Sequence, residues 1–388
     1  MPGSIKYMTV NNCNMACSVI SKPAALILIV LIFTSCSANV FSSASNFIMQ
    51  PYLQGMTEYS VFIMVESVSK KPVFVDYSNE EGTTFTESTS YYRVTDKRNP
   101  LTYVHRIKLA GLEPGVNYRY KLRQGSSRAG EYSFRTIGRG EPLRIAVCSD
   151  NAKGSMVFAD ICKQLKSRSP QFVLHAGDVS YSSRYSTWKR DFFIRDFLDL
   201  ATSVPFYVAI GNHEGWRPNT LAFLEAPPSA SGEQHYYSFE TGNTYILVLS
   251  SQHPAGQGSR QYAYAEQSLA STKKPWKIVM FHKSAYCGCP HGNLSDFREL
   301  ADSVLAKYKA DIVINGHSHH YQKNYVNGIY HFIMGGAGSG LHDPEPAVFS
   351  LESVQAHHYA IFEITGKRLG MKVYGLEGAI IDSLELEK

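Results

Sequence analysis

Residues 172–181, with the sequence Phe-Val-Leu-His-Ala-Gly-Asp-Val-Ser-Tyr, constrain the fold of this 388-residue chain more than any other segment. Their apolar start at 172–174 predicts a short buried strand that leads into a Gly-Asp turn at Asp178. Strands buried on both faces are typical of parallel sheets covered by helices, in which ligands bind beyond the carboxyl ends of the strands. A Gly-Asp turn alone is common. Four other segments repeat the arrangement, however, because each follows an apolar strand with a side chain that can bind a metal ion.

The five strand ends carry carboxylate, amide and imidazole groups. They are Asp150 after 143–148, Asp178 after 172–174, Asn212 and His213 after 205–210, His282 after 276–281, and His317 and His319 after 311–314. Such ligands suit Fe, Zn or Mn, whereas Cu(I) and Fe–S clusters prefer thiolates. Alternate residues of an extended segment face the same side, so His317 and His319 can enter one cavity. A catalytic zinc uses three protein ligands, so about seven ligands fit two metal ions that share a carboxylate better.

Ordinary structural roles are the alternative for each residue taken alone. A single strand-end Asp or His more often caps a turn or satisfies a polar contact than binds a metal. The run Gly-Asn-His-Glu at 211–214 is different, because its chance occurrence in a chain of this length is about one in a hundred or less. Gly-Asp-x-x-Tyr and Gly-His-x-His occur in the same chain. His175, inside the strand, fits core packing better, and His320 is expected to point away from the cavity.

The sequence changes its periodicity near residue 140. Between 46 and 137, short runs rich in Val, Phe, Tyr and Thr alternate with turn residues, which predicts an all-β sandwich of about ninety residues. Residues 138–142, Gly-Arg-Gly-Glu-Pro, form the predicted linker. From 143 to 388, strands alternate with helices and three short strands close the chain, which predicts a layered α/β domain.

The N-terminus has the features of a targeting segment. Lys22 precedes an apolar run at 24–33, which is shorter than the roughly 20 residues needed to span a bilayer, and small residues follow it. We therefore interpret residues 1–38 as a signal peptide and expect a secreted or cell-envelope protein. Cys36 stands where a bacterial lipoprotein carries its lipid, although Phe33 replaces the usual Leu; cleavage after Ala38 is the alternative. We expect contact with a membrane only through a lipid anchor at Cys36. If the source is bacterial, we expect a periplasmic or lipid-anchored protein.

Composition argues against a nucleic-acid-binding protein. The net charge of +5 is spread along the chain, and no basic block is longer than the Lys pairs at 70–71 and 273–274. A mildly positive protein suits an anionic substrate.

Four of the seven cysteines lie beyond the leader. Cys148 lies in a predicted strand and Cys162 in a predicted helix, so both are expected to be buried thiols. Cys287 and Cys289 are separated by one glycine, which we interpret as too close for an easy disulfide, and no second pair completes a zinc site. Their role is left open by the sequence.

The ordered motifs Asp150, Gly-Asp178-x-x-Tyr181, Gly-Asn212-His213-Glu214, His282 and Gly-His317-x-His319 resemble those of the calcineurin-like metallophosphoesterases, and among them the purple acid phosphatases. The resemblance covers nearly the whole chain after the leader, because that family commonly carries a fibronectin type III-like N-terminal domain. The run at 109–118 is similar to the L-x-x-L-x-P-x-x-x-Y corner of such domains. The wider superfamily has Asp-x-His at its first motif, whereas Asn151 and Ala152 follow Asp150 here, and Tyr181 matches the tyrosine that replaces the missing ligand.

The resemblance implies a binuclear centre of Fe(3+) and a divalent metal ion, Zn, Fe or Mn. By position, the ferric ligands would be Asp150, Asp178, Tyr181 and His319, and the divalent ligands Asp178, Asn212, His282 and His317, with Asp178 bridging. Two cations lower the pKa of a bound water and neutralise charge on the phosphoryl oxygens. His213 and His291 match the family's phosphate-binding and proton-donating histidines, His291 only by its spacing within a loop.

The implied function is hydrolysis of small phosphate monoesters by an acid phosphatase. A phosphodiesterase or nucleotide phosphohydrolase with the same metals is the alternative, and a non-enzymatic secreted binding protein is a further one, which predicts a damaged ligand set. Three departures from the family pattern are present. Asp150 lies in Ser-Asp-Asn instead of Gly-Asp-x-Gly, Lys323 replaces an Arg, and the loop at 283–292 differs from the plant-type sequence.

Overall fold

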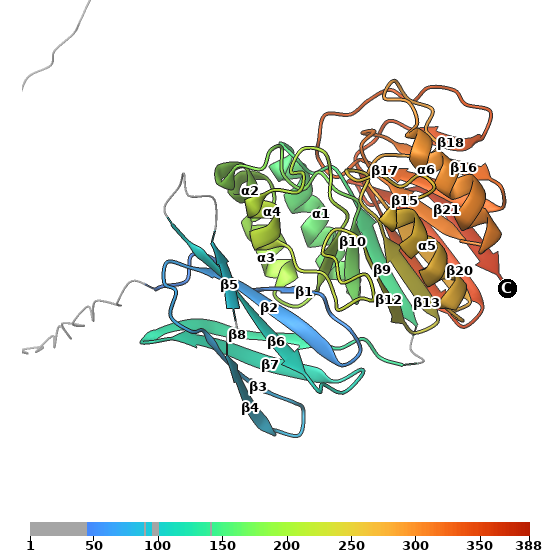
Figure 1. Cartoon of the computed structure of the whole chain (residues 1–388). Helices are drawn as coiled ribbons and strands as arrows, with labels where there is room; N and C mark the ends of the chain where they lie inside the picture. Colours follow the sequence, from blue (N-terminus) through green and yellow to red (C-terminus); the bar gives the residue numbers. More distant parts are fainter. Residues whose placement is uncertain (1–44, 89–90, 95–100, 140–141) are drawn as a thin grey trace, which may run out of the picture. The chain divides into compact units, whose positions relative to one another are not determined.

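The computed structural model describes residues 45–88, 91–94, 101–139 and 142–388 (Figure 1). The predicted signal peptide at 1–38, with Cys36, lies outside the described residues. The described strands form a ten-stranded, a seven-stranded and a four-stranded sheet. Among the described residues, no helix is both long and apolar enough to cross a membrane.

The predicted all-β region consists of two packed sheets. Its strands are β1 (Tyr52–Gln54), β2 (Ser60–Ser67), β3 (Phe74–Ser78), β4 (Thr84–Ser88), β5 (Tyr91–Val94), β6 (Tyr103–Ala110), β7 (Asn117–Gln124) and β8 (Ser127–Arg135). β1, β2, β6 and β5 are neighbours in one sheet, and β4, β3, β7 and β8 form the other. Buried and exposed residues alternate along the first six residues of β7, so Tyr118 and Tyr120 enter the core that Ile63 of β2 also joins.

The remaining elements alternate as predicted for an α/β fold. They are β9 (Leu143–Cys148), α1 (Ser155–Arg168), β10 (Phe172–His175), α2 (Tyr185–Asp191), α3 (Arg195–Ala201), β11 (Phe206–Val208), α4 (Pro218–Phe223), β12 (Tyr237–Thr241), β13 (Thr244–Val248), α5 (Arg260–Ser271), β14 (Trp276–Met280), α6 (Ser295–Leu300), the π-helical turn η1 (Ala301–Leu305), β15 (Ile312–Asn315), β16 (Tyr321–Val326), β17 (Ile329–Met334), β18 (Ser350–Val354), β19 (His358–Thr365), β20 (Arg368–Gly375) and β21 (Ile380–Glu387).

In the α/β region, the ten-stranded and seven-stranded sheets pack face to face between two layers of helices. Ile145 of β9, Phe362 of β19 and Ile278 of β14 share one core between the sheets. α1 to α4 pack on the other face of the ten-stranded sheet, and α5 and α6 pack on the other face of the seven-stranded sheet (Figure 1). This αββα arrangement confirms the predicted fold class.

The all-β and α/β regions share the ten-stranded sheet. β1 pairs in parallel with β11, with Gln54 opposite Phe206, so that the sheet passes from the sandwich into the α/β region. A buried ion pair between Arg106 and Glu225 joins the same regions.

Parallel pairing places the polar strand ends at one edge of each of the two sheets. β9, β10 and β11 run parallel, as do β13, β14, β15 and β17. Their carboxyl ends therefore open into the loops that carry the candidate ligands.

Candidate metal centre

Asp178, two residues after the Ala176 that follows β10, lies at the middle of the site. Its backbone adopts a left-handed conformation (φ 53°), and its carboxylate is buried. The His213 N–H donates to Asp178 Oδ1 at 3.0 Å, and His282 Nε2 lies 3.2 Å from Asp178 Oδ2. Gly211 makes this approach possible, because a Cβ there would lie 2.1 Å from Asp178 Oδ1. Burial raises the pKa of Asp178, but the charge and hydrogen bond of His282 outweigh burial and hold the pKa well below its usual range.

His282 directs one ring nitrogen toward Asp178. Its Nδ1 lies 2.8 Å from the Ala176 carbonyl oxygen, which can only accept, so Nδ1 donates and Nε2 is left for another partner. Nε2 also lies 3.2 Å from Asn212 Oδ1. Burial lowers the pKa of His282, but the carboxylate of Asp178 raises it to about 9 overall. A cation bound here would take the place of that proton.

The ligand atoms of Asp178, His282 and His317 lie within 4.8 Å of one another. The ring centroids of His282 and His317 are 5.2 Å apart. Burial lowers the pKa of His317 to about 3, which keeps its imidazole neutral, the form that binds metals. These contacts bring together ligands that the sequence places after three different strands.

Asp150 and His319 form a second pair beside this group. His319 Nδ1 donates to the Gly340 carbonyl oxygen at 2.7 Å, and its Nε2 lies 3.6 Å from Asp150 Oδ1. Asp150 is buried; its Oδ2 accepts from the His317 N–H at 2.9 Å, whereas Oδ1 has no hydrogen-bond partner among the described residues. Burial raises the pKa of Asp150 to about 7. A buried carboxylate oxygen with an imidazole nitrogen opposite fits a cation, because an unpaired buried charge is costly.

Tyr181 and His213 lie at the edge of this group. Their rings stack with centroids 4.7 Å apart, and the Lys153 ammonium lies 3.3 Å from the Tyr181 centroid. Within the described part of the chain, no hydrogen bond joins the Tyr181 hydroxyl to Asp150 or Asp178. The role of Tyr181 as a metal ligand therefore stays a prediction. His213 Nδ1 lies 3.1 Å from the Tyr181 carbonyl oxygen, and His213 Nε2 lies 3.8 Å from Asp178 Oδ2.

His291 lies on an exposed loop, yet its ring faces the site. Its centroid is 4.8 Å from that of His317 and 5.0 Å from that of His342. The structure therefore brings this histidine, predicted only from its spacing, next to a candidate ligand.

Two further residues of the site have no role predicted from the sequence. Glu214 Oε1 accepts from the Gly211 N–H at 2.7 Å and from the Asp178 N–H at 3.1 Å, so Glu214 joins two ligand-bearing loops. Burial raises its pKa to about 8. Glu214 belongs to the Gly-Asn-His-Glu motif, and that motif is the sequence signal that could have identified it.

His342 is the second residue of the site without a role predicted from the sequence. Its ring stacks on His319 with centroids 4.1 Å apart and planes 18° apart. The His342 N–H donates to the His319 carbonyl at 2.9 Å, and His342 Nδ1 accepts from the His319 N–H at 3.2 Å. It lies in a Gly- and Pro-rich loop without periodicity, so no sequence signal identified it.

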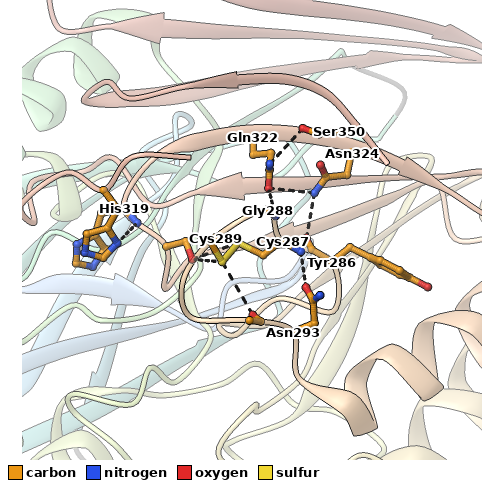
Figure 2. Close-up of a disulfide and its surroundings, with 12 residues drawn as sticks. Tyr286, Cys287, Gly288, Cys289, Asn293, His319, Gln322, Asn324 and Ser350 are labelled. Carbon is orange, nitrogen blue, oxygen red and sulfur yellow. Dashed lines mark hydrogen bonds between the residues drawn. A yellow bond between two sulfur atoms is a disulfide. The ribbon is translucent and has the colours of Figure 1, made fainter. Parts of the chain in front are cut away.

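The expectation for Cys287 and Cys289 was wrong, because the two residues form a disulfide (Figure 2). Their Cα atoms are 5.4 Å apart, a normal separation for a bridge. Gly288 allows the close packing of this turn, since a Cβ there would lie 2.2 Å from the Glu345 carbonyl oxygen. Cys148 and Cys162 are buried free thiols, as predicted.

The comparisons with known proteins agree with this geometry. The family model for calcineurin-like phosphoesterases matches residues 143–321. The chain is 28% identical over 305 residues to probable inactive purple acid phosphatase 1 of Arabidopsis thaliana, covering 62% of this chain and 49% of the relative. It is 27% identical over 308 residues to phosphoenolpyruvate phosphatase of Allium cepa, covering 72% of this chain and 61% of the relative.

Among solved structures, the fold is similar to that of the purple acid phosphatase PPD1 from yellow lupin (Lupinus luteus). The TM-score is 0.76 at 21% identity, over 87% of this chain and 74% of the lupin chain. The chain spans about half the length of the first curated relatives it matches. Residues 143–321 therefore belong to the calcineurin-like phosphoesterase family, and the chain is a homologue of the purple acid phosphatases.

Proposed function

We propose that this protein hydrolyses phosphate monoesters with the help of two metal ions. The observation that carries the proposal is the position of Asp178, whose buried carboxylate lies beside His282 and His317, with Asp150 and His319 forming an adjacent pair. A shared carboxylate between two sets of ligands is the arrangement that binuclear hydrolases use.

In this proposal, Asp178, Asn212, His282 and His317 would hold a divalent Zn, Fe or Mn ion. Asp150, Asp178, Tyr181 and His319 would hold Fe(3+), because a hard trivalent ion suits three anionic oxygen ligands. When bound, the two cations supply Lewis acidity that lowers the pKa of water and neutralises charge on phosphoryl oxygens.

His213 and His291 would contact the substrate. The Tyr181 carbonyl oxygen fixes Nδ1 of His213, which leaves Nε2 near Asp178. A phosphate oxygen bound there could accept a hydrogen bond from Nε2 when that nitrogen carries a hydrogen. His291 extends from the exposed loop toward His317, so it can give a proton to the leaving oxygen.

The relatives support phosphoester hydrolysis in general, because one is a phosphoenolpyruvate phosphatase, but another is a purple acid phosphatase described as probably inactive. A non-enzymatic binding protein is expected to have lost part of the ligand set, whereas every ligand position that the motifs define is filled here.

A substrate panel tests the proposal. We expect the purified protein to hydrolyse p-nitrophenyl phosphate faster than bis(p-nitrophenyl) phosphate or ATP at mildly acidic pH. Asp160→Asn, on the exposed face of α1, should leave turnover unchanged. Faster cleavage of the diester or of ATP would replace the monoesterase proposal, and no turnover of any phosphoester in metal-replete protein would contradict it.

The visible spectrum tests the ferric ligand. Iron bound by a Tyr181 phenolate should give a charge-transfer band that disappears in Tyr181→Phe. An unchanged band in that variant would exclude Tyr181 as an iron ligand.

We also propose that the protein is exported, either secreted or held in the cell envelope, because residues 1–38 have the pattern of a signal peptide. Cell fractionation of wild type and Cys36→Ala tests this. Membrane association lost in the variant would indicate a lipid anchor, and cytoplasmic retention of the wild type would contradict export.

A further inference from the structure

The loop between β14 and α6 joins the Cys287–Cys289 disulfide to His291. Gly292 N–H donates to the Cys289 carbonyl oxygen at 3.1 Å, which closes a four-residue turn with His291 at its third position. Cys289, one end of the bridge, is thus the first residue of the turn that presents His291 to His317. One end of the bridge and His291 therefore lie in the same four-residue turn.

The disulfide also contacts the segment that carries two candidate ligands. Ser318, between His317 and His319, is buried, and its Oγ lies 3.0 Å from Cys289 Sγ and 3.3 Å from Cys287 Sγ. Disulfide sulfurs can only accept, so the Ser318 hydroxyl donates to them. Reduction would place thiol hydrogens at this contact and would end the covalent link between the two sulfurs.

Backbone and side-chain hydrogen bonds hold the residue between the cysteines. Gly288 N–H donates to Gln322 Oε1 at 2.9 Å (Figure 2). The Gly288 carbonyl accepts from the Glu345 N–H at 2.9 Å. The Cys287 N–H donates to Asn293 Oδ1 at 2.5 Å, which ties the first cysteine of the bridge to the residue that follows the turn 289–292. The bridge is thus anchored to β16 on one side and to the residue after the turn bearing His291 on the other.

We propose that Cys287 and Cys289 are positioning residues and that their disulfide is a redox-sensitive support for His291. In the oxidised form the bridge holds the turn 289–292 against His317. A dithiol reductant transfers two electrons and two protons to the bridge, which yields the two cysteine thiols and the cyclic disulfide of the reductant. The loop then loses its covalent constraint, His291 leaves its place, and turnover falls. This inference rests on the proposed phosphatase function for its kinetic readout only.

The kinetic test is a double-mutant cycle between the bridge and His291. We expect Cys287→Ser/Cys289→Ser to lower kcat/KM by about tenfold, since small displacements of a catalytic group can reduce rates up to about a hundredfold. In a His291→Ala background, the same double substitution should cause no further loss. Additive losses in the two backgrounds would overturn the inference, because they would show that the bridge does not act through His291.

Chemical reduction of the folded protein supplies a second test that does not depend on variants. Dithiothreitol should slowly lower turnover of the wild type, because both cysteines are nearly buried, and should leave the double variant unaffected. Equal inhibition of both proteins would place the target at the metal centre and overturn the inference.

Hydrogen–deuterium exchange gives a readout without catalysis. Reduction should increase exchange at 287–294 in the wild type, with metal content unchanged and with α5 as the internal reference. If the protein hydrolyses no phosphoester, the proposed function fails while this measurement still decides the inference. Unchanged exchange in fully reduced protein would overturn it.

Discussion

At the scale of single residues, backbone carbonyl groups orient the imidazoles of the site. The Nδ1 atoms of His282, His319 and His213 lie within 3.1 Å of the carbonyl oxygens of Ala176, Gly340 and Tyr181. Each contact fixes the ring and leaves Nε2 for a cation or a substrate. Such supporting contacts strengthen metal binding because they fix the tautomer of the ligand.

His342 should affect metal binding through His319. His342→Ala removes both the ring stack and the acceptor for the His319 N–H, so we expect metal affinity to fall by about tenfold, the lower end for such supporting residues. His342→Phe keeps a ring to stack, and His342→Asn keeps an acceptor, so each should lose less. Competition with a chromogenic chelator measures the affinities.

The comparison among these variants separates this role from a general loss of stability. Thermal unfolding of the metal-free proteins is the control, and it should change little across the series because His342 is partly exposed. Wild-type metal affinity in His342→Ala would contradict the supporting role.

At the scale of secondary-structure elements, the candidate ligands could be predicted from the sequence because they follow the ends of strands. Asp178, His282 and His317 each follow an apolar strand. Parallel pairing brings together the ends of β14 and β15, and the face-to-face packing of the two sheets places the end of β10 beside them, regardless of their separation along the chain. His342 could not be predicted, because its position depends on the path of an irregular loop. The Cys287–Cys289 bridge was missed for a related reason: spacing alone does not reveal that Gly288 packs against Glu345.

β17 contains a buried histidine that should make the protein sensitive to acid. His331 is almost inaccessible, neither ring nitrogen has a hydrogen-bond partner among the described residues, and burial lowers its pKa to about 3. It faces the ring of Tyr286 and pairs across the sheet with Asn324.

Below about pH 6.5, the ordinary pKa of a histidine, His331 therefore binds a proton in the unfolded chain but not in the folded protein. The free energy of unfolding that comes from keeping His331 neutral is fully present above about pH 6.5 and is lost progressively toward pH 3. About 2 kcal/mol of it is lost at pH 5.

His331→Leu should remove this part of the acid sensitivity. The loss of unfolding free energy between pH 7 and pH 5, measured by urea denaturation, should be about 2 kcal/mol smaller than in the wild type. Phe332→Leu on the same strand carries no titrating group, so it should lower stability equally at both pH values. An identical pH dependence in His331→Leu and wild type would contradict the assignment.

At the scale of the whole described chain, the all-β and α/β regions are expected to unfold together. They share the ten-stranded sheet, and Arg106 on β6 is fully buried against Glu225, with Nε to Oε2 at 2.5 Å. The Arg106 guanidinium also donates to the carbonyl oxygens of Leu221 and Ala222 at 2.6 Å and 2.8 Å. Arg106 therefore satisfies several buried acceptors at the junction.

Arg106→Met should destabilise both regions by about 3–5 kcal/mol, because it leaves the buried Glu225 carboxylate without this cation. Glu225→Gln keeps an oxygen that accepts from the guanidinium, so it should cost less. Denaturant titration followed by tryptophan fluorescence and circular dichroism should give one coincident transition in the wild type. Two separate transitions in the wild type would contradict cooperative unfolding.

The metal content of the purified protein tests the central claim most directly. Elemental analysis of the wild type should find two metal ions per chain, one of them iron, and Asp178→Asn should lose both ions together with more than about a hundredfold of turnover. Asp178→Asn protein that keeps two metal ions and full turnover, or active wild type that binds fewer than two, would contradict a centre bridged by Asp178.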